Sequence, residues 1–304
     1  MILSLVPDRT LQLLTEAYAR AVPRRIRSVV TRIRNAVTVK RITRYYRDTE
    51  LDSEMRDALS YLPFTDFLNF PYPWTKDIRQ REAFMDADSG LPYVVLNGKR
   101  CYFLRGMPLR DVSINATCIN DLEQHAESPH LYLTPEFDVE HGDVVADCGA
   151  GDGNFGLSVV DRVKKLYLFE PDEKWQEPLR QTFKPWADRV EIIKKYVSDT
   201  ESEDSVTLDG FFKDKEGPTF LKVDVEGYER VALMGASEIL CSSVKKAVVC
   251  TYHLADDLVT LSEIMSAKHF SVDPSNGYLL ITSDGRRPDL RRGLIRCTKT
   301  EGFA

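Results

Sequence analysis

The sequence predicts an α/β fold in which a mostly parallel, doubly wound sheet follows a helical and β-hairpin accessory region. Three observations support this prediction. From Val139 onward, short apolar runs alternate with segments of helical periodicity. The runs are apolar without alternation, as expected for strands buried on both faces. The first run leads directly into a glycine-rich turn at residues 147–153, as in nucleotide-binding β-α units. We therefore expect three segments: residues 1–47, residues 48–137 and the α/β domain 138–304.

Residues 1–47 are predicted to contain a basic amphipathic helix. Ile26, Val29, Ile33 and Val37 recur at helical spacing, and arginines lie between them. The segment holds eleven Lys or Arg residues and two acids, so its charge is about +9. Because the net charge of the whole chain is -6, the remaining residues carry about -15. Such a helix can lie on an anionic membrane surface, pack on the acidic body or pair with a second copy. Peripheral contact with the inner membrane face and a homodimer both stay open.

Residues 48–137 are predicted to form an accessory or substrate region. A helix is expected from Glu50 to Leu62, followed by a stretch of prolines and aromatic residues. Asn97-Gly98 separates two β-rich runs, residues 93–96 and 99–103, which is a strong hairpin signal. The tract from Ser128 to Pro135 then leads into the α/β domain.

The α/β domain is predicted to consist of repeated strand–helix units. The expected strands are residues 144–146, 166–169, 190–193, 220–223 and 247–251. The expected helices are residues 155–163, 173–183, 228–240 and 257–268. Residues 278–282 and 294–298 are expected to pair as a closing antiparallel hairpin.

Composition excludes several function classes. No apolar stretch approaches the roughly 20 residues that span a bilayer, and the N-terminus lacks the pattern of a secretory signal. The six cysteines are scattered without a Cys-x-x-Cys pair, which argues against a zinc ribbon or a disulfide framework and suits a reducing cytoplasm. An acidic body also argues against a nucleic-acid partner, because phosphate neutralisation requires a basic surface.

The glycine-rich turn and one later carboxylate predict a nucleoside cofactor. Ligands of open α/β sheets bind beyond the carboxyl ends of the strands. Asp147 ends the first predicted strand there, and Glu170 follows the second, where a carboxylate can accept both ribose hydroxyls. Residues 151–156 also fit the G-x-G-x-x-G dinucleotide fingerprint. However, Asp147 and Asp152 would repel a pyrophosphate and attract a cationic sulfonium, which favours S-adenosylmethionine over NAD.

Four stretches of the sequence resemble the FkbM-type family of class I S-adenosylmethionine-dependent methyltransferases. They are residues 144–156, 169–171, 207–212 and 220–236, the last of which contains the block LKVDVEGYE. The resemblance covers roughly residues 128–300. It implies a Rossmann-like, seven-stranded, mostly parallel sheet and O-methylation of a hydroxyl on a glycan or small hydroxylated metabolite. Many members carry an Asn-Ala pair after the third strand, whereas this chain has Ser198 and Asp199 there, which we expect to contact adenine.

The predicted cofactor-binding residues are Asp147, Gly149, Ala150, Gly151, Asn154, Glu170, Pro171, Ser198, Asp199 and Asp224.

Residues at the ends of the fourth and fifth strands are the candidates for chemistry. His253 is expected to be the base, because an unperturbed imidazole pKa near 6.5 suits proton removal at neutral pH. Asp224 and Glu226 would orient the cofactor or the acceptor, or cap the following helix. Together with His253 they could also hold Mg²⁺, but spacing alone is poor evidence, so no metal is predicted. The residues predicted to contact the acceptor are His130 and Tyr132, on a tract that could close as a lid, and Tyr252.

Two other functions stay open. A nicotinamide-dependent oxidoreductase would explain the glycine spacing, although no evident hydride-transfer pair accompanies it. A non-catalytic module could keep the fold and use its basic helix to dock on a membrane or a protein.

Overall fold

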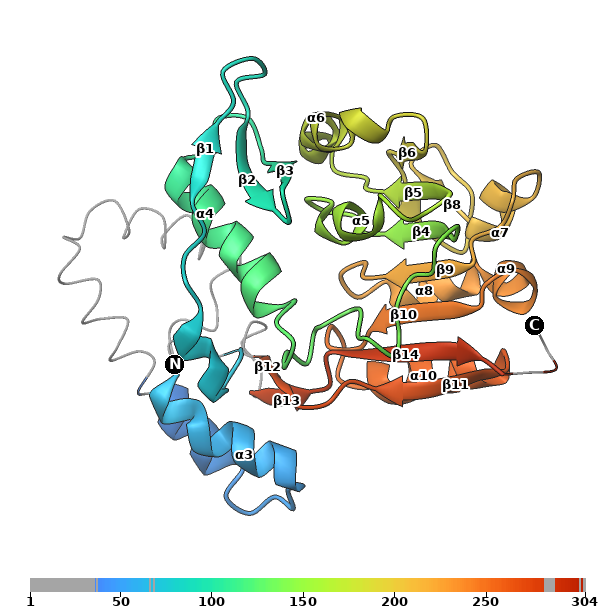
Figure 1. Cartoon of the computed structure of the whole chain (residues 1–304). Coiled ribbons are helices and arrows are strands. Elements are labelled where there is room, and N and C mark those ends of the chain that lie inside the picture. Colours follow the sequence, from blue (N-terminus) through green and yellow to red (C-terminus); the bar gives the residue numbers. More distant parts are fainter. Residues whose placement is uncertain are drawn as a thin grey trace. The chain divides into compact units, whose positions relative to one another are not determined.

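The computed structural model describes residues 36, 38–65, 67, 69–281, 288–300 and 302. The chain forms two compact units, Met1–Lys76 with Leu280–Leu290 and Asp77–Leu279 with Arg291–Ala304 (Figure 1). Most of the predicted basic helix lies outside the described residues, within which residues 38–45 are helical. The division at residues 47 and 137 stays a prediction.

The first unit contains short helices. Helix α3 (Ser53–Tyr61) begins after Asp52, whose side chain accepts a hydrogen bond from the backbone N–H of Met55 and so caps the helix. The expected helix in this region is therefore confirmed. Two 3₁₀ helices follow, η2 (Leu62–Phe64) and η3 (Pro73–Asp77). In the same unit, the Tyr46 hydroxyl accepts a hydrogen bond from the backbone N–H of Leu290 at 2.9 Å.

The second unit contains the predicted sheet of seven strands (Figure 1). Its order is β11-β14-β10-β9-β4-β5-β6. Numbered along the chain, the strands follow the order 3-2-1-4-5-7-6, and the last one, β14, is antiparallel to both neighbours. The class I methyltransferase-like, mostly parallel sheet is therefore confirmed. The strands are β4 (Val144–Cys148), β5 (Lys165–Phe169), β6 (Val190–Ile193), β9 (Phe220–Val223), β10 (Lys246–Cys250), β11 (Phe270–Pro274) and β14 (Leu294–Lys299).

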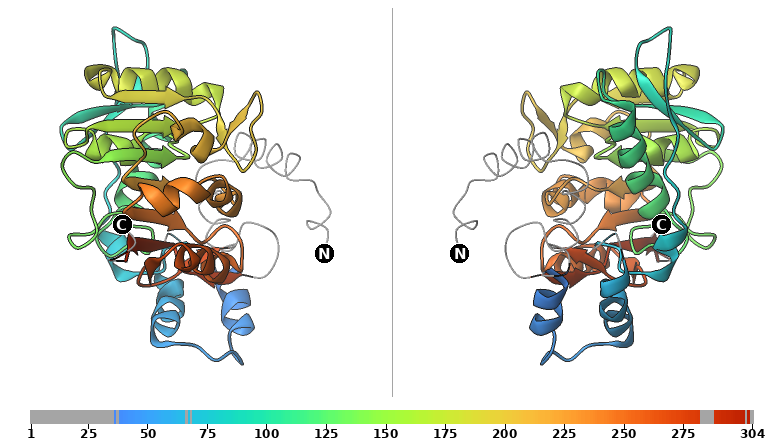
Figure 2. Two further views of the ribbon diagram at one scale, coloured as in Figure 1. Left: turned by 90° about the vertical axis from the view of Figure 1, so that its right-hand side faces the viewer. Right: turned by 90° about the vertical axis from the view of Figure 1, so that its left-hand side faces the viewer.

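Helices cover both faces of this sheet (Figure 2). Successive strand residues point to opposite faces, so Val145 packs in one buried cluster and Val144 in the other. Residues of α5 (Asn154–Val159) and α6 (Glu173–Thr182) belong to the first cluster. Residues of α7 (Leu208–Phe212), α8 (Glu229–Met234), α9 (Ser237–Ser242) and α10 (Asp257–Ala267) belong to the second.

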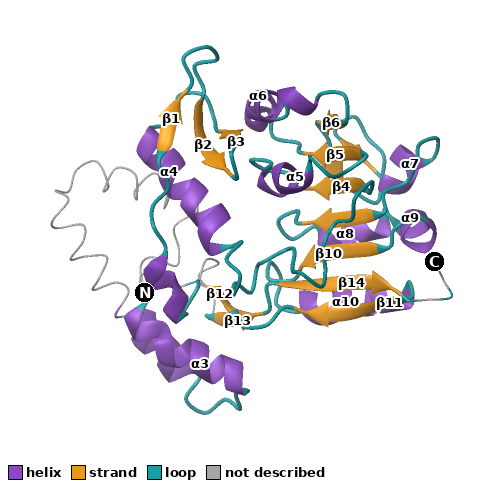
Figure 3. Ribbon diagram, viewed as in Figure 1, coloured by secondary structure: helices purple, strands orange, loops and turns teal. Residues whose placement is uncertain are grey.

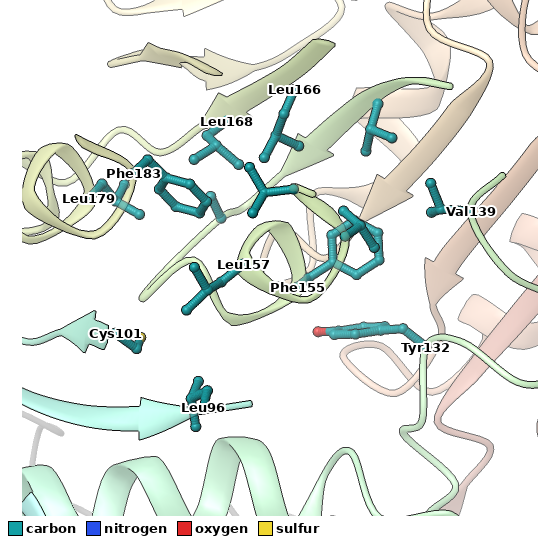
Figure 4. Packing of buried hydrophobic residues seen from close by; sticks show 14 of the residues in the cluster. Leu96, Cys101, Tyr132, Val139, Phe155, Leu157, Leu166, Leu168, Leu179 and Phe183 are labelled. Atoms are coloured by element: carbon teal, nitrogen blue, oxygen red, sulfur yellow. The ribbon is translucent and has the colours of Figure 1, made fainter. Parts of the chain in front are cut away.

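A small antiparallel sheet packs on the α5 side of the large one (Figure 3). It consists of β1 (Ala83–Met85), β2 (Pro92–Leu96) and β3 (Lys99–Tyr102). The predicted hairpin is confirmed, because Asn97 and Gly98 both have positive φ, 49° and 79°, as a type I′ turn requires. Leu157 of α5 lies between the large sheet and the hairpin residues Leu96 and Cys101 (Figure 4). Helix α4 (Leu109–Thr117) and the π-helical turn η4 (Cys118–Leu122) follow.

Two sequence predictions about the later elements are wrong. Residues 294–298 do not pair with residues 278–282. They lie within β14, which pairs with β10 and β11, whereas β12 (Leu279–Ile281) pairs with β13 (Asp289–Arg291). The helix expected over 228–240 is two helices, α8 and α9. Gly235 lies between them because the chain passes close to another loop there: a Cβ would stand 1.9 Å from the Ser198 carbonyl oxygen.

The remaining elements are short. They are the pair β7 (Tyr196–Val197) and β8 (Ser205–Val206) and the 3₁₀ helix η5 (Lys184–Trp186). Within the described part of the chain, no helix combines the length and the apolar character needed to span a membrane.

Candidate active site

A cavity of about 880 Å³ lies beyond the carboxyl ends of β4, β5 and β9. Its position agrees with the rule for ligand sites in open α/β sheets. Most of the predicted site residues line it: Tyr132, Gly149, Ala150, Gly151, Asn154, Glu170, Pro171, Ser198, Asp224, Glu226 and Tyr252. The other predicted residues, Asp147, Asp199, His130 and His253, lie outside this lining.

The glycine-rich turn after β4 is held tightly against the neighbouring strands. The backbone N–H groups of Gly149 and Ala150 both donate to the carbonyl oxygen of Phe169, at 3.0 and 3.1 Å. Gly149 has a φ of +79°, and a Cβ at this position would stand 1.8 Å from the Asp224 carbonyl oxygen. Only glycine fits this contact without moving the backbone. The turn is thereby fixed between the ends of β5 and β9, with its outer edge in the cavity.

Glu170 is anchored with its carboxylate at the cavity. Oε2 accepts a hydrogen bond from Gly151 N at 2.8 Å, and Oε1 accepts one from Asp172 N at 2.9 Å. Burial raises the pKa of Glu170, and these backbone N–H groups oppose the shift. Each carboxylate oxygen has two acceptor positions, so one on each remains for a ligand. A rigid acceptor pair of this kind suits the two hydroxyls of a ribose.

Asp147 forms a buried ion pair beside the cavity. Its side chain is completely buried, and Oδ1 lies 3.0 Å from Lys222 Nζ, the residue paired with it across β4 and β9. Burial alone would lower the pKa of Lys222, but the carboxylates of Asp147 and Asp224 outweigh this effect and raise it. The charge of Asp147 is therefore balanced by a buried lysine ammonium, and its contact with a cofactor stays a prediction.

The cavity is nevertheless strongly acidic. Among the described residues that line it, seven are carboxylates and two are lysines. The carboxylates are Glu123, Asp152, Glu170, Asp172, Asp204, Asp224 and Glu226, and the lysines are Lys195 and Lys222. Burial raises the pKa of Asp152 to about 6. At neutral pH the site attracts cations and disfavours a diphosphate.

Asp224 lies at the inner end of the cavity and remains charged. Its Oδ2 accepts a hydrogen bond from the Tyr132 hydroxyl at 2.6 Å. Burial alone would raise the pKa of Asp224, but Lys222 and His253 contribute to a net lowering. The Tyr132 contact also explains why this tyrosine, predicted from the tract before the sheet, belongs to the site.

His253 lies beside the cavity among three carboxylates. Its Nδ1 is 2.9 Å from Glu229 Oε1, and its Nε2 is 3.5 Å from Glu226 Oε2 and 3.8 Å from Asp224 Oδ1. Burial alone would lower the pKa of His253, but these carboxylates raise it to about 10. His253 lies where the sequence placed it, with carboxylates at both ring nitrogens. Its role as the base stays a prediction.

His130 is a buried neutral histidine and does not face the cavity. It is 2% exposed, and burial lowers its pKa to about 4. Its Nε2 lies 3.7 Å from Cys250 Sγ, and its ring packs edge-on against Tyr132 and Tyr252. His130 packs against two tyrosines that line the cavity, and its predicted contact with an acceptor stays a prediction.

Comparison with known families agrees with this geometry. Residues 184–257 match the family model of the methyltransferase FkbM domain. The resemblance predicted from the sequence is confirmed there. No curated protein matches the chain in sequence.

Solved methyltransferase structures are similar to the chain at low identity. The FkbM methyltransferase of Methylobacillus flagellatus KT has 21% identity and a TM-score of 0.45 over 60% of this chain, and the match spans 52% of that structure, about half of its length. Precorrin-6y C5,15-methyltransferase of Geobacter metallireducens GS-15 has 14% identity and a TM-score of 0.39, covering 53% of this chain and 82% of that one. An rRNA methylase of Streptococcus thermophilus has 16% identity and a TM-score of 0.36, covering 54% and 90%.

Three residues of this site were missed by sequence reasoning: Glu123, Lys222 and Cys250. Lys222 carried a signal, because a lysine inside an apolar strand needs a buried counter-charge. Glu229, in the LKVDVEGYE block, was predicted with the other strand-end carboxylates. Glu123 and Cys250 carried none: Glu123 precedes the sheet by more than twenty residues, and Cys250 resembles any small buried residue.

Proposed function

We propose that this protein is an S-adenosylmethionine-dependent methyltransferase that O-methylates a hydroxyl of a glycan or a small hydroxylated metabolite. The single observation that carries the proposal is the acidic cavity with Glu170 anchored at its edge. A ribose hydroxyl pair, a positive sulfur and a hydroxylated acceptor all match such a set of acceptors and negative charges.

The charge of the cavity supports S-adenosylmethionine rather than NAD as the cofactor. A sulfonium is stabilised by nearby carboxylates, whereas the pyrophosphate of NAD would be repelled by them. The lining has seven carboxylates against two lysines within the described chain, and one of those lysines, Lys222, already balances Asp147. The literal G-x-G-x-x-G spacing at residues 151–156 therefore does not favour the oxidoreductase.

Individual residues have distinct roles in the proposed cofactor site. S-adenosylmethionine supplies a methyl group on a positively charged sulfur. Glu170 would accept the ribose hydroxyls, and the Gly149–Gly151 turn would allow the backbone to approach the cofactor closely. Pro171 and Ser198 also line the cavity, and Ser198 belongs to the stretch where the adenine contacts were predicted.

The acceptor would meet Asp224 and Glu123. Asp224 is ionised and can accept the hydrogen bond of an incoming hydroxyl, which aligns its oxygen with the methyl group. Burial raises the pKa of Glu123 to about 8, and the charges of Asp224 and Asp152 reinforce the shift. At neutral pH a carboxyl with this pKa is mostly protonated and would donate a hydrogen bond to the acceptor, so the ionised Asp224 is the better candidate to take the hydroxyl proton.

The decisive experiment is calorimetric titration of the full chain with S-adenosylhomocysteine and, separately, with NAD. We expect saturable binding of S-adenosylhomocysteine and none of NAD. Transfer of a labelled methyl group to a panel of sugars and hydroxylated metabolites would then identify the acceptor class. Binding of NAD alone would make the protein a nicotinamide enzyme. Binding of neither ligand would leave the non-catalytic module as the better explanation.

A further inference from the structure

The two oxygens of Asp224 have different surroundings. Oδ2 accepts the hydrogen bond from the Tyr132 hydroxyl. Oδ1 is buried and has no hydrogen-bond partner among the residues that the structure describes. The side chain of Asp224 is 15% exposed, so water reaches little of it. A buried carboxylate oxygen without a donor is costly, and such an atom in a cavity indicates a missing ligand.

Two further polar atoms face the same point. His253 Nε2 lies 3.8 Å from Asp224 Oδ1 and 3.5 Å from Glu226 Oε2, and neither contact is an aligned hydrogen bond. Glu229 is completely buried. Its Oε1 accepts from Val225 N and lies against His253 Nδ1, while its Oε2 has no donor within the described parts of the chain.

Two distances in this cluster are those of ligand atoms around one ion. Ligands about 2.1–2.2 Å from a common ion lie about 3.0–3.8 Å apart at angles between 90° and 120°. The separations of His253 Nε2 from Glu226 Oε2 and Asp224 Oδ1, 3.5 and 3.8 Å, fall in this range. Polar atoms of Asp224, Glu229 and His253 already lie close together, and the exposed Glu226 side chain would turn toward Asp224 to complete the shell. A carboxylate on the other ring nitrogen, here Glu229, is the usual second partner of a metal-binding histidine. Glu226 also has a left-handed φ of 56°, a conformation that in a non-glycine residue often marks a functional site.

We propose that Asp224, Glu226 and His253 bind a divalent cation, with Glu229 orienting the imidazole from behind. Two carboxylates and one imidazole form a donor set suited to Mn²⁺ or Mg²⁺, with water or an acceptor hydroxyl completing the shell. A cation there would lower the pKa of a bound hydroxyl. The inference goes beyond the proposed function, because cation binding needs no methyl transfer.

A second cluster on the other side of Asp224 is a weaker candidate. His130, Cys250 and Asp224 Oδ2 also lie close together. Their polar atoms, however, already have partners: His130 Nε2 is in contact with Cys250 Sγ, His130 Nδ1 with Gln124, and Oδ2 with Tyr132. Burial also raises the pKa of the Cys250 thiol well above its usual value, so a thiolate ligand is disfavoured there. The unpartnered atoms lie on the His253 side.

The test is a titration of the full, metal-stripped chain with Mn²⁺, following the free ion by electron paramagnetic resonance. We expect one saturable site that Mg²⁺ displaces. Glu226→Gln should weaken binding at least about tenfold, the usual minimum for disturbing a metal shell. The Glu226 side chain is 89% exposed, so this variant should fold normally. Asp224→Asn should abolish binding.

Matched controls locate the site. Glu263→Gln, an exposed carboxylate on α10, should bind Mn²⁺ as the wild type does, and so should Cys250→Ser. The proposal is overturned if no saturable binding occurs, if Glu226→Gln is unchanged, or if Cys250→Ser removes the site instead. Binding of S-adenosylhomocysteine is measured separately in metal-free buffer, so failure of the cation site and failure of the proposed function give different results.

Discussion

Replacing Glu170 by alanine tests the proposed cofactor site most directly. In the structure each oxygen of this carboxylate accepts one backbone N–H, from Gly151 and from Asp172, and keeps one acceptor position for a ligand. Losing a charged acceptor for buried ribose hydroxyls should weaken cofactor binding by about 1–3 kcal/mol. That free energy corresponds to a dissociation constant raised about 5- to 150-fold.

The assay is calorimetric titration with S-adenosylhomocysteine at fixed pH. Glu173→Ala is the matched control, because Glu173 is exposed on the first turn of α6 and pairs with Lys194 rather than with the cavity. Glu170→Ala also frees the N–H groups of Gly151 and Asp172, so part of the loss can come from a loosened turn. Repeating both titrations with a cofactor analogue that lacks the ribose 2′ hydroxyl separates the two effects, because a direct contact makes the two changes non-additive.

The reasoning is refuted in either of two cases. Glu170→Ala could bind S-adenosylhomocysteine as tightly as the wild type. Alternatively, removal of the 2′ hydroxyl could cost the same in both proteins, which would show that Glu170 does not contact the ribose.

Three further predictions concern stability. Gly149→Ala should lower the melting temperature and abolish S-adenosylhomocysteine binding, because the added Cβ would overlap the Asp224 carbonyl. Gly151→Ala is the control: its φ is also positive, but its Cβ would meet nothing within 4 Å. This variant should lower the free energy of unfolding in urea by only about 1–2 kcal/mol. Lys222→Met should destabilise the fold by about 3–5 kcal/mol, because it leaves the Asp147 carboxylate buried and unpaired. Adding Asp147→Leu should restore most of that loss. If stability does not recover in the double variant, the two residues are not coupled. The pKa of His130 is about 4 in the folded chain against 6.5 for an ordinary histidine, so the unfolded chain takes up the proton first as pH falls. About 3 kcal/mol of the free energy of unfolding should therefore be lost between pH 6.5 and 4. In His130→Phe this dependence on pH should be weaker, and an identical dependence would contradict the burial argument.

Local patterns predicted most of the fold because local rules decide it. The apolar runs at residues 144–146, 166–169 and 220–223 are strands buried on both faces, and no other element suits them. Two features depended on distant contacts. Strand β11 has only its first residue, Phe270, buried, and its partner β14 lies some twenty residues further along the chain. The interruption between helices α8 and α9 at Gly235 is caused by close contact with the loop at Ser198. The residues of the two helices do not predict that contact.

The site was predictable in position but not in charge. Glycines and carboxylates at strand ends located the cavity, since sheet geometry brings those ends together. The proton states depend on neighbours that only the folded chain supplies. Lys222 balances Asp147, neighbouring carboxylates raise the pKa of His253, and burial lowers that of His130. Glu123 enters from a segment that no strand pattern connects to the cavity.

The hydrogen bond from Tyr132 to Asp224 has a consequence for how this protein can be divided. A fragment beginning at residue 138 would retain every strand of the large sheet and the whole glycine-rich turn. It would also lack the tyrosine that covers one oxygen of Asp224, and with it Glu123, so water would reach a carboxylate that the intact protein shields. Grafting the sheet alone onto another protein would therefore transfer the glycine-rich turn and Glu170 but not Tyr132 and Glu123.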